Sequence, residues 1–60
     1  MNDYMTKLIE RFEKENPNLY VMPRPLGEYE ILCRISGNRI QRFNNIGKLE
    51  DYLLRVVRNE

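Results

Sequence analysis

The 60-residue sequence predicts an α+β fold in which two helices pack on one face of a three-stranded antiparallel meander. Three observations lead to this two-layer α-β-β-β-α prediction. Apolar residues recur at helical spacing near both ends of the chain. They alternate with polar residues in its middle, and a Ser-Gly-Asn sequence marks a tight turn there. A chain this short has room for a single domain, residues 1–60, with a thin core.

The first helix is expected over about residues 3–15. Asn2 or Asp3 can cap its start. Asn16 is expected to end it, because the residue before a proline is pushed out of the helical region. The apolar stripe of this helix consists of Met5, Leu8, Ile9 and Phe12.

The middle of the chain predicts the strands. Residues 19–22 form a short β-prone run, and it is expected at a sheet edge because Pro23 and Pro25 cannot donate to a central ladder. Residues 28–35 alternate with a period of two, which is the clearest strand signal in the sequence. A third strand is expected to follow the turn, over about residues 39–43.

Gly37 and Asn38 predict a two-residue type I′ turn, because both tolerate the positive φ angles that this turn needs. Pairing outward from this turn determines the expected register of the hairpin. In that register Ser36 faces Arg39, Ile35 faces Ile40, Arg34 faces Gln41, Cys33 faces Arg42 and Leu32 faces Phe43.

The expected register divides the side chains between two faces of the sheet. The helices are expected to cover the face with Leu19, Val21, Ile31, Cys33, Ile35 and Ile40. The other face is expected to be open and to carry Tyr20, Met22, Leu32, Arg34, Arg39, Gln41 and Phe43.

Arg42 fits this register poorly, because it would lie under the helices and burying an unpaired guanidinium is costly. Two alternatives remain. A bulge near Arg42 can turn it outward and bring Phe43 into the core, or its side chain can reach around the sheet edge to an acid on a helix.

The second helix is expected to begin near residues 45–47 and to run to about residue 57. Glu50 and Asp51 in its first turn, and Arg55 and Arg58 in its last, suit the helix dipole. Its apolar residues are Ile46, Leu49, Tyr52, Leu53, Val56 and Val57.

The distribution of charge favours a DNA- or RNA-binding protein. The net charge is only +1, but residues 1–33 have four bases and six acids, whereas residues 34–60 have six bases and three acids. Arginines beside an exposed ring, either Phe43 or Tyr20, suit phosphate and an unstacked base. The same arginines also suit a hairpin that is merely well solvated. The candidate nucleic-acid-binding residues are Arg34, Arg39, Arg42 and Lys48.

A protein-interaction module is the alternative function, either as a homodimer or as a small inhibitor of a larger protein. An open apolar sheet face and an edge strand are features that bind other chains. Small size and few chemical groups would suit an accessory protein of a phage, a plasmid or an archaeal virus. The candidate interface residues are Tyr20, Met22, Leu32 and Phe43.

The sequence argues against an enzyme and against a metal or cofactor site. It contains no histidine and only one cysteine, so acid-base catalysis and zinc binding lack their usual groups. Cys33 is expected to be a buried structural residue. Glu28 and Glu30 share a strand face, but a domain of this size offers no substrate cleft between them.

The N-terminal segment is charged throughout and no 18 apolar residues run together, so a cytoplasmic protein is expected. The order of the elements resembles that of double-stranded-RNA-binding domains, but NNIGKLEDYL has only Lys48 where that family has several lysines. GNRIQ followed by a helix is similar to the wing of small excisionases, but a single helix precedes it here. No site residue is carried over from either family.

Overall fold

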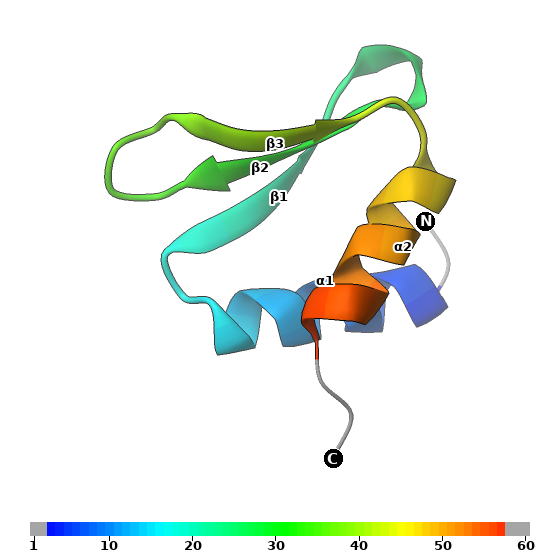
Figure 1. The fold of residues 1–60 in the computed structure, drawn as a ribbon, viewed down its shortest axis with the longest axis horizontal. Helices are drawn as coiled ribbons and strands as arrows, with labels where there is room; N and C mark the ends of the chain where they lie inside the picture. The colour runs from blue at the N-terminus through cyan, green and yellow to red at the C-terminus, as the bar shows by residue number, and fades with distance from the viewer. Residues whose placement is uncertain (1–2, 58–60) are drawn as a thin grey trace.

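The computed structural model describes residues 3–57, and it confirms the predicted fold class. The strands form one antiparallel sheet in the order β1-β2-β3, and both helices lie on the same side of it (Figure 1). The elements are α1 (Asp3–Glu15), β1 (Leu19–Pro23), the short turn η1 (Pro25–Gly27), β2 (Tyr29–Cys33), β3 (Arg39–Phe43) and α2 (Ile46–Val56).

Helix α1 ends and α2 begins where the sequence predicts, and the structure adds an asparagine side chain bonded to the backbone at each boundary. Asn16 follows α1, and both its backbone N–H and its side-chain amide donate to the carbonyl of Phe12, at 2.9 and 3.0 Å. Asn45 precedes α2 in an extended conformation, and its Oδ1 accepts the N–H of Lys48 at 2.9 Å. Asn2, the other cap considered for α1, lies outside the described residues.

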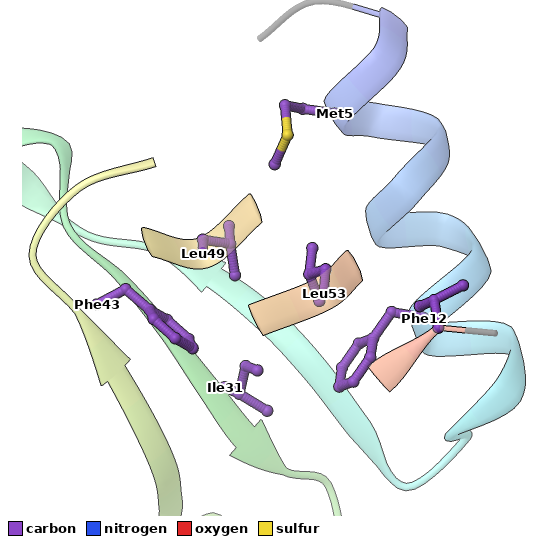
Figure 2. Close-up of a cluster of buried hydrophobic side chains, with 7 residues drawn as sticks. Met5, Phe12, Ile31, Phe43, Leu49 and Leu53 are labelled. Carbon is purple, nitrogen blue, oxygen red and sulfur yellow. The ribbon is translucent and has the colours of Figure 1, made fainter. Parts of the chain in front are cut away.

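One hydrophobic cluster joins the two helices to the sheet (Figure 2). Tyr52 of α2 contacts both other parts of this cluster. Its ring centroid lies 6.4 Å from that of Phe12 on α1 and 5.3 Å from that of Phe43 on β3. The helical stripes predicted from the sequence supply most of this cluster. Its buried members are Met5, Phe12, Ile31, Phe43, Leu49, Leu53 and Val57.

The predicted type I′ turn is wrong. Strand β2 ends at Cys33, and five residues, 34–38, connect it to β3. Gly37 has a φ of 76° and donates its N–H to the carbonyl of Cys33 at 2.8 Å, but Asn38 has no positive φ. A type I′ turn needs positive φ at two consecutive residues, so a longer connection forms.

The register of β2 and β3 therefore differs from the expected one. A bulge lies where Ile40 has no partner, between the Ile31 and Leu32 pairs. The bulge adds one residue to β3, so the side chains after it, at residues 41–43, lie on the opposite face from the expected one. The observed pairs are Tyr29 with Phe43, Glu30 with Arg42, Ile31 with Gln41, and Leu32 with Arg39.

The longer connection and the bulge together move β3 by three to four residues along β2, which corrects several predicted positions. Phe43 is buried in the core, whereas Gln41 pairs with Ile31 instead of lying on the open face. Ile35 and Ile40 were expected beneath the helices, but they are 79% and 53% exposed. The hairpin of β2 and β3 extends beyond the helical layer (Figure 1).

The connection between β1 and β2 contains the two consecutive positive φ angles that the other hairpin lacks. Leu26 has a φ of 65° and Gly27 a φ of 75°. For glycine this conformation is free of cost, but for leucine it costs about 1–2 kcal/mol. Leu26 is also 94% exposed, so no packing offsets this strain.

Replacing Leu26 by asparagine is expected to stabilise the protein, because asparagine tolerates the left-handed region far better. The expected gain is about 0.5–1 kcal/mol, which corresponds to a rise in Tm of roughly 2–8 °C for a domain of this size. Thermal unfolding followed by circular dichroism measures it.

Gly27→Ala is the control for this prediction. Nothing lies within 4 Å of the added Cβ, so only backbone strain acts and Tm is expected to fall. If Leu26→Asn lowered Tm as well, Leu26 would have a packing role that its exposure does not indicate.

Candidate functional site

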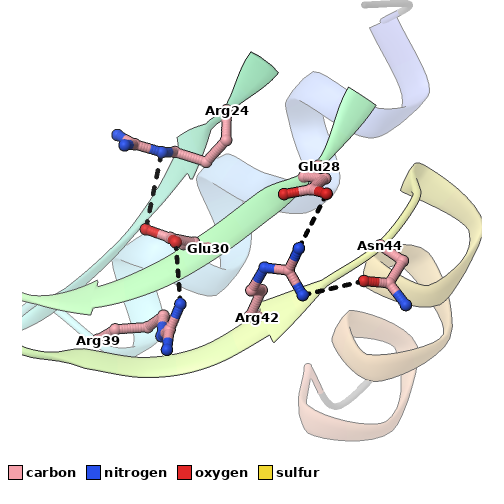
Figure 3. Close-up of polar contacts among 6 residues, drawn as sticks. All are labelled: Arg24, Glu28, Glu30, Arg39, Arg42 and Asn44. Carbon is pink, nitrogen blue, oxygen red and sulfur yellow. Dashed lines mark hydrogen bonds and ion pairs between the residues drawn. The ribbon is translucent and has the colours of Figure 1, made fainter. Parts of the chain in front are cut away.

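The side of the sheet that faces away from the helices carries the candidate site. Glu28 and Glu30 lie along the central strand on this side, and arginines flank them from both neighbouring edges (Figure 3). We call this surface the arginine face. It consists of Arg24, Arg34, Arg39, Arg42, Glu28, Glu30 and Tyr20.

Glu30 is the centre of the arginine face and links its two sides. One carboxylate oxygen lies 3.8 Å from Nε of Arg24, which follows β1. The other lies 3.3 Å from Nη1 of Arg39 on β3. The Glu30 side chain is mostly buried beneath these two arginines, so they cover the middle of the sheet.

Arg42 points outward because of the bulge, as the first of the two alternatives for this residue predicts. Its Nη2 lies 2.8 Å from the carboxylate of Glu28, and its Nη1 donates to Oδ1 of Asn44 at 3.1 Å (Figure 3). The bulge lies at Ile40, two residues before Arg42. The Arg42 guanidinium therefore has polar partners without reaching around the sheet edge to an acid on a helix.

Arg34 has no acidic partner on the arginine face. Its guanidinium carbon lies 4.9 Å from the centroid of the Tyr20 ring, a cation–π distance. Its Nε donates to the carbonyl of Pro17 at 3.1 Å. These two contacts hold Arg34 over one face of the ring, so Tyr20 is not a free platform for a base.

The arginine face has an excess of positive charge. Its four guanidiniums face two carboxylates, so two positive charges remain without an acid. The side chains of Arg24, Arg39 and Arg42 are 48, 56 and 44% exposed. The arginine half of each ion pair is therefore accessible to an external anion.

The structure brings together three of the four predicted nucleic-acid-binding residues, namely Arg34, Arg39 and Arg42. Lys48 lies on the helical side of β3, where it lines a groove with Arg42. The prediction missed Arg24, which follows β1 outside the regular strand. The alternation of Glu28 and Glu30 was the available signal, because acids on a central strand attract arginines from both neighbours.

The predicted apolar interface is smaller than expected. Tyr20, Met22 and Leu32 are half-buried, and the register places them on the same side as the arginines. Phe43, the fourth predicted residue, is in the core because of the bulge. The arginine side chains therefore dominate this side of the sheet.

Cys33 is half-buried at the end of β2, so the prediction of a buried cysteine is wrong. Ser36 in the following turn donates from its hydroxyl to the sulfur. Backbone groups of Ser36 and Ile35 add to this bonding, and together they lower the pKa of the Cys33 thiol. A larger fraction of this thiol is therefore ionised near neutral pH than in an ordinary cysteine.

Replacing Ser36 by alanine is expected to slow the alkylation of Cys33 by iodoacetamide at pH 7. Loss of the hydroxyl raises the pKa of the thiol toward its ordinary value, so the reactive thiolate is less abundant. Ser36→Thr retains a hydroxyl and is expected to preserve the rate. Equal rates for the serine and alanine proteins across pH 6–9 would show that Ser36 does not stabilise the thiolate.

Comparison with known proteins does not place the chain in a family. No protein-family model, curated protein sequence or solved structure matches it. Within residues 3–57, acidic and cysteine side chains do not gather in the groups of three or more that a metal ion requires. Neither described helix is both long and apolar enough to cross a membrane.

Proposed function

We propose that this protein binds nucleic acid through the arginine face, by contact with the phosphate backbone. The observation that carries the proposal is the gathering of four arginines on one open side of the sheet, three of them against two glutamates and the fourth over Tyr20. Arginine suits this role because its planar guanidinium can donate two parallel hydrogen bonds to a phosphate.

The ion pairs on the arginine face are compatible with such binding. The Arg42–Glu28 pair is exposed on both sides, so a phosphate can displace Glu28 at little cost. Glu30 is mostly buried and keeps its arginines, but the exposed guanidiniums of Arg24 and Arg39 remain accessible to a phosphate. Phosphate binding also releases counterions from the nucleic acid, a gain that a bond within the protein does not provide. Lys48 adds a further cation beside Arg42 at the β3 edge.

The side chains of the arginine face favour contact with the phosphate backbone over recognition of individual bases. Arg34 covers the Tyr20 ring, and Phe43 is buried, so neither predicted aromatic residue is free to stack on a base. Binding is therefore expected to depend strongly on salt and only weakly on sequence. A cytoplasmic location, as expected from the sequence, would give the protein access to nucleic acid.

Fluorescence anisotropy with labelled duplex DNA, single-stranded DNA and RNA tests the proposal at low and at physiological salt. If about three phosphates are neutralised, the log-log dependence of affinity on salt should have a slope of about −3 for duplex DNA and about −2 for a single strand. No binding to any of the three probes at low salt would refute the proposed function.

A matched pair of double variants locates the binding surface. Arg39→Gln with Arg42→Gln removes two positive charges from the arginine face and is expected to abolish binding. Lys7→Gln with Lys14→Gln removes the same charge from the exposed side of α1 and is expected to bind nearly normally. Equal losses in both variants would indicate that net charge alone controls binding.

A further inference from the structure

The two edges of the sheet differ in whether another strand can join them. At the β1 edge, the N–H of Val21 donates to Oε2 of Glu13 on α1 at 2.8 Å. Pro23 at the end of the same strand has no N–H to offer. Helix α1 and a proline therefore close this edge against further pairing.

The β3 edge is open in the part of the chain that the structure describes. The N–H of Arg34 donates to the carbonyl of Asn18, so even-numbered residues of β2 direct their backbone groups toward β1. Odd-numbered residues therefore bond to β3, where Gln41 and Phe43 are their partners. It follows that the N–H and C=O of Arg42, between these two, point away from the sheet.

Among residues 3–57, no strand lies beyond β3, and no side chain bonds to the outward backbone groups of Arg42. Ile40, at the bulge, pairs with no residue of β2, and its side chain is 53% exposed. The open edge thus offers backbone hydrogen bonds together with an apolar contact. These are the features by which a sheet binds an extended peptide.

Cations lie on both sides of the β3 edge. Arg39 and Arg42 lie on the arginine face. On the helical side, a groove of about 440 Å³ runs between β3 and α2; Arg42 borders it from the strand edge, and its other charged residues are Lys48, Arg55 and a single acid, Asp51. Because the side chains of a strand alternate between the two faces, acidic residues of an added strand would meet a cation on either side.

We propose that the open edge of β3 binds an extended acidic segment of a partner protein as a fourth strand of the sheet. A second copy of β3 fits the edge less well, because it would bring two further arginines into the same short ladder, and like charges on paired strands are destabilising. The acidic segment and nucleic acid would both use Arg39 and Arg42, so they are expected to compete.

Selection from a displayed library of random nine-residue peptides, using the whole protein as bait, tests the proposal. Enriched peptides are expected to be acidic, rich in β-branched residues and free of central prolines. Failure to enrich acidic peptides would overturn the proposal. This selection does not involve nucleic acid, so its result and that of the anisotropy experiment are independent.

Hydrogen exchange identifies the mode of binding for an enriched peptide. Strand addition is expected to slow exchange of the Arg42 amide, while the Val21 amide, already bonded to Glu13, is unchanged. Two versions of the peptide are made, one methylated at its odd-numbered and one at its even-numbered backbone nitrogens, because only one of these two sets of N–H groups would face β3. One set should bind about tenfold or more weakly and the other almost normally. Equal effects of the two sets, or no protection of Arg42, would refute strand addition.

Discussion

Replacing Leu53 by alanine is expected to remove a large fraction of the stability of the protein at 25 °C. Leu53 is fully buried and points from α2 into the core between α1 and the sheet (Figure 2). Removing a buried leucine side chain costs about 2–5 kcal/mol, because the cavity closes only in part. A domain of this size has a total stability of roughly 3–9 kcal/mol, so the loss is comparable with the whole.

Leu54→Ala is a matched control for this prediction, because it makes the same change at the next position of the same helix. Leu54 is 48% exposed, so its loss should cost less than about 1 kcal/mol. Urea unfolding followed by circular dichroism compares the two variants. Similar midpoints for both would mean that α2 does not pack on the sheet through Leu53.

The fold could be predicted largely because each helix carries its own signals. The apolar stripes of α1 and α2 agree with the buried residues, and Asn16 and Asn45 mark helix boundaries through local hydrogen bonds. Such signals depend only on residues within one turn, which are adjacent in the sequence.

The register of the second hairpin could not be predicted in the same way. Gly37 and Asn38 are common in two-residue turns, but Cys33 bonds to Asn38 and Gly37 across a five-residue connection instead. Two gains outside the turn favour this arrangement. The bulge brings Phe43 against Tyr52 in the core and frees Arg42 to reach Glu28.

Three of the four arginines of the candidate site were predictable, but Arg24 and the two acids were not. Counting charges along the chain identified Arg34, Arg39 and Arg42, because they are close in sequence. The roles of Glu28 and Glu30 depend on which residues lie opposite them on β1 and β3, and the register error concealed this. The acids therefore become the sharpest test of the proposed function.

Replacing both Glu28 and Glu30 by glutamine is expected to strengthen nucleic-acid binding by about tenfold. The change removes the two carboxylates that compete with phosphate for the arginines, and it raises the excess positive charge of the arginine face from two to four. Each removed charge near a phosphate is worth roughly 0.7 kcal/mol at the high dielectric constant of a surface. Fluorescence anisotropy at about 0.1 M salt measures the gain, and the salt dependence should become steeper.

A gain in affinity is informative because a misfolded variant would not bind more tightly through one specific surface. Glu10→Gln with Glu15→Gln changes the net charge by the same amount but lies on the exposed side of α1, among Lys7, Arg11 and Lys14. This control should bind within about twofold of the original protein, since charges beyond a Debye length of roughly 10 Å are screened at 0.1 M salt. If it gained as much affinity as the arginine-face variant, nucleic acid would respond to total charge and the arginine face would not be the binding surface.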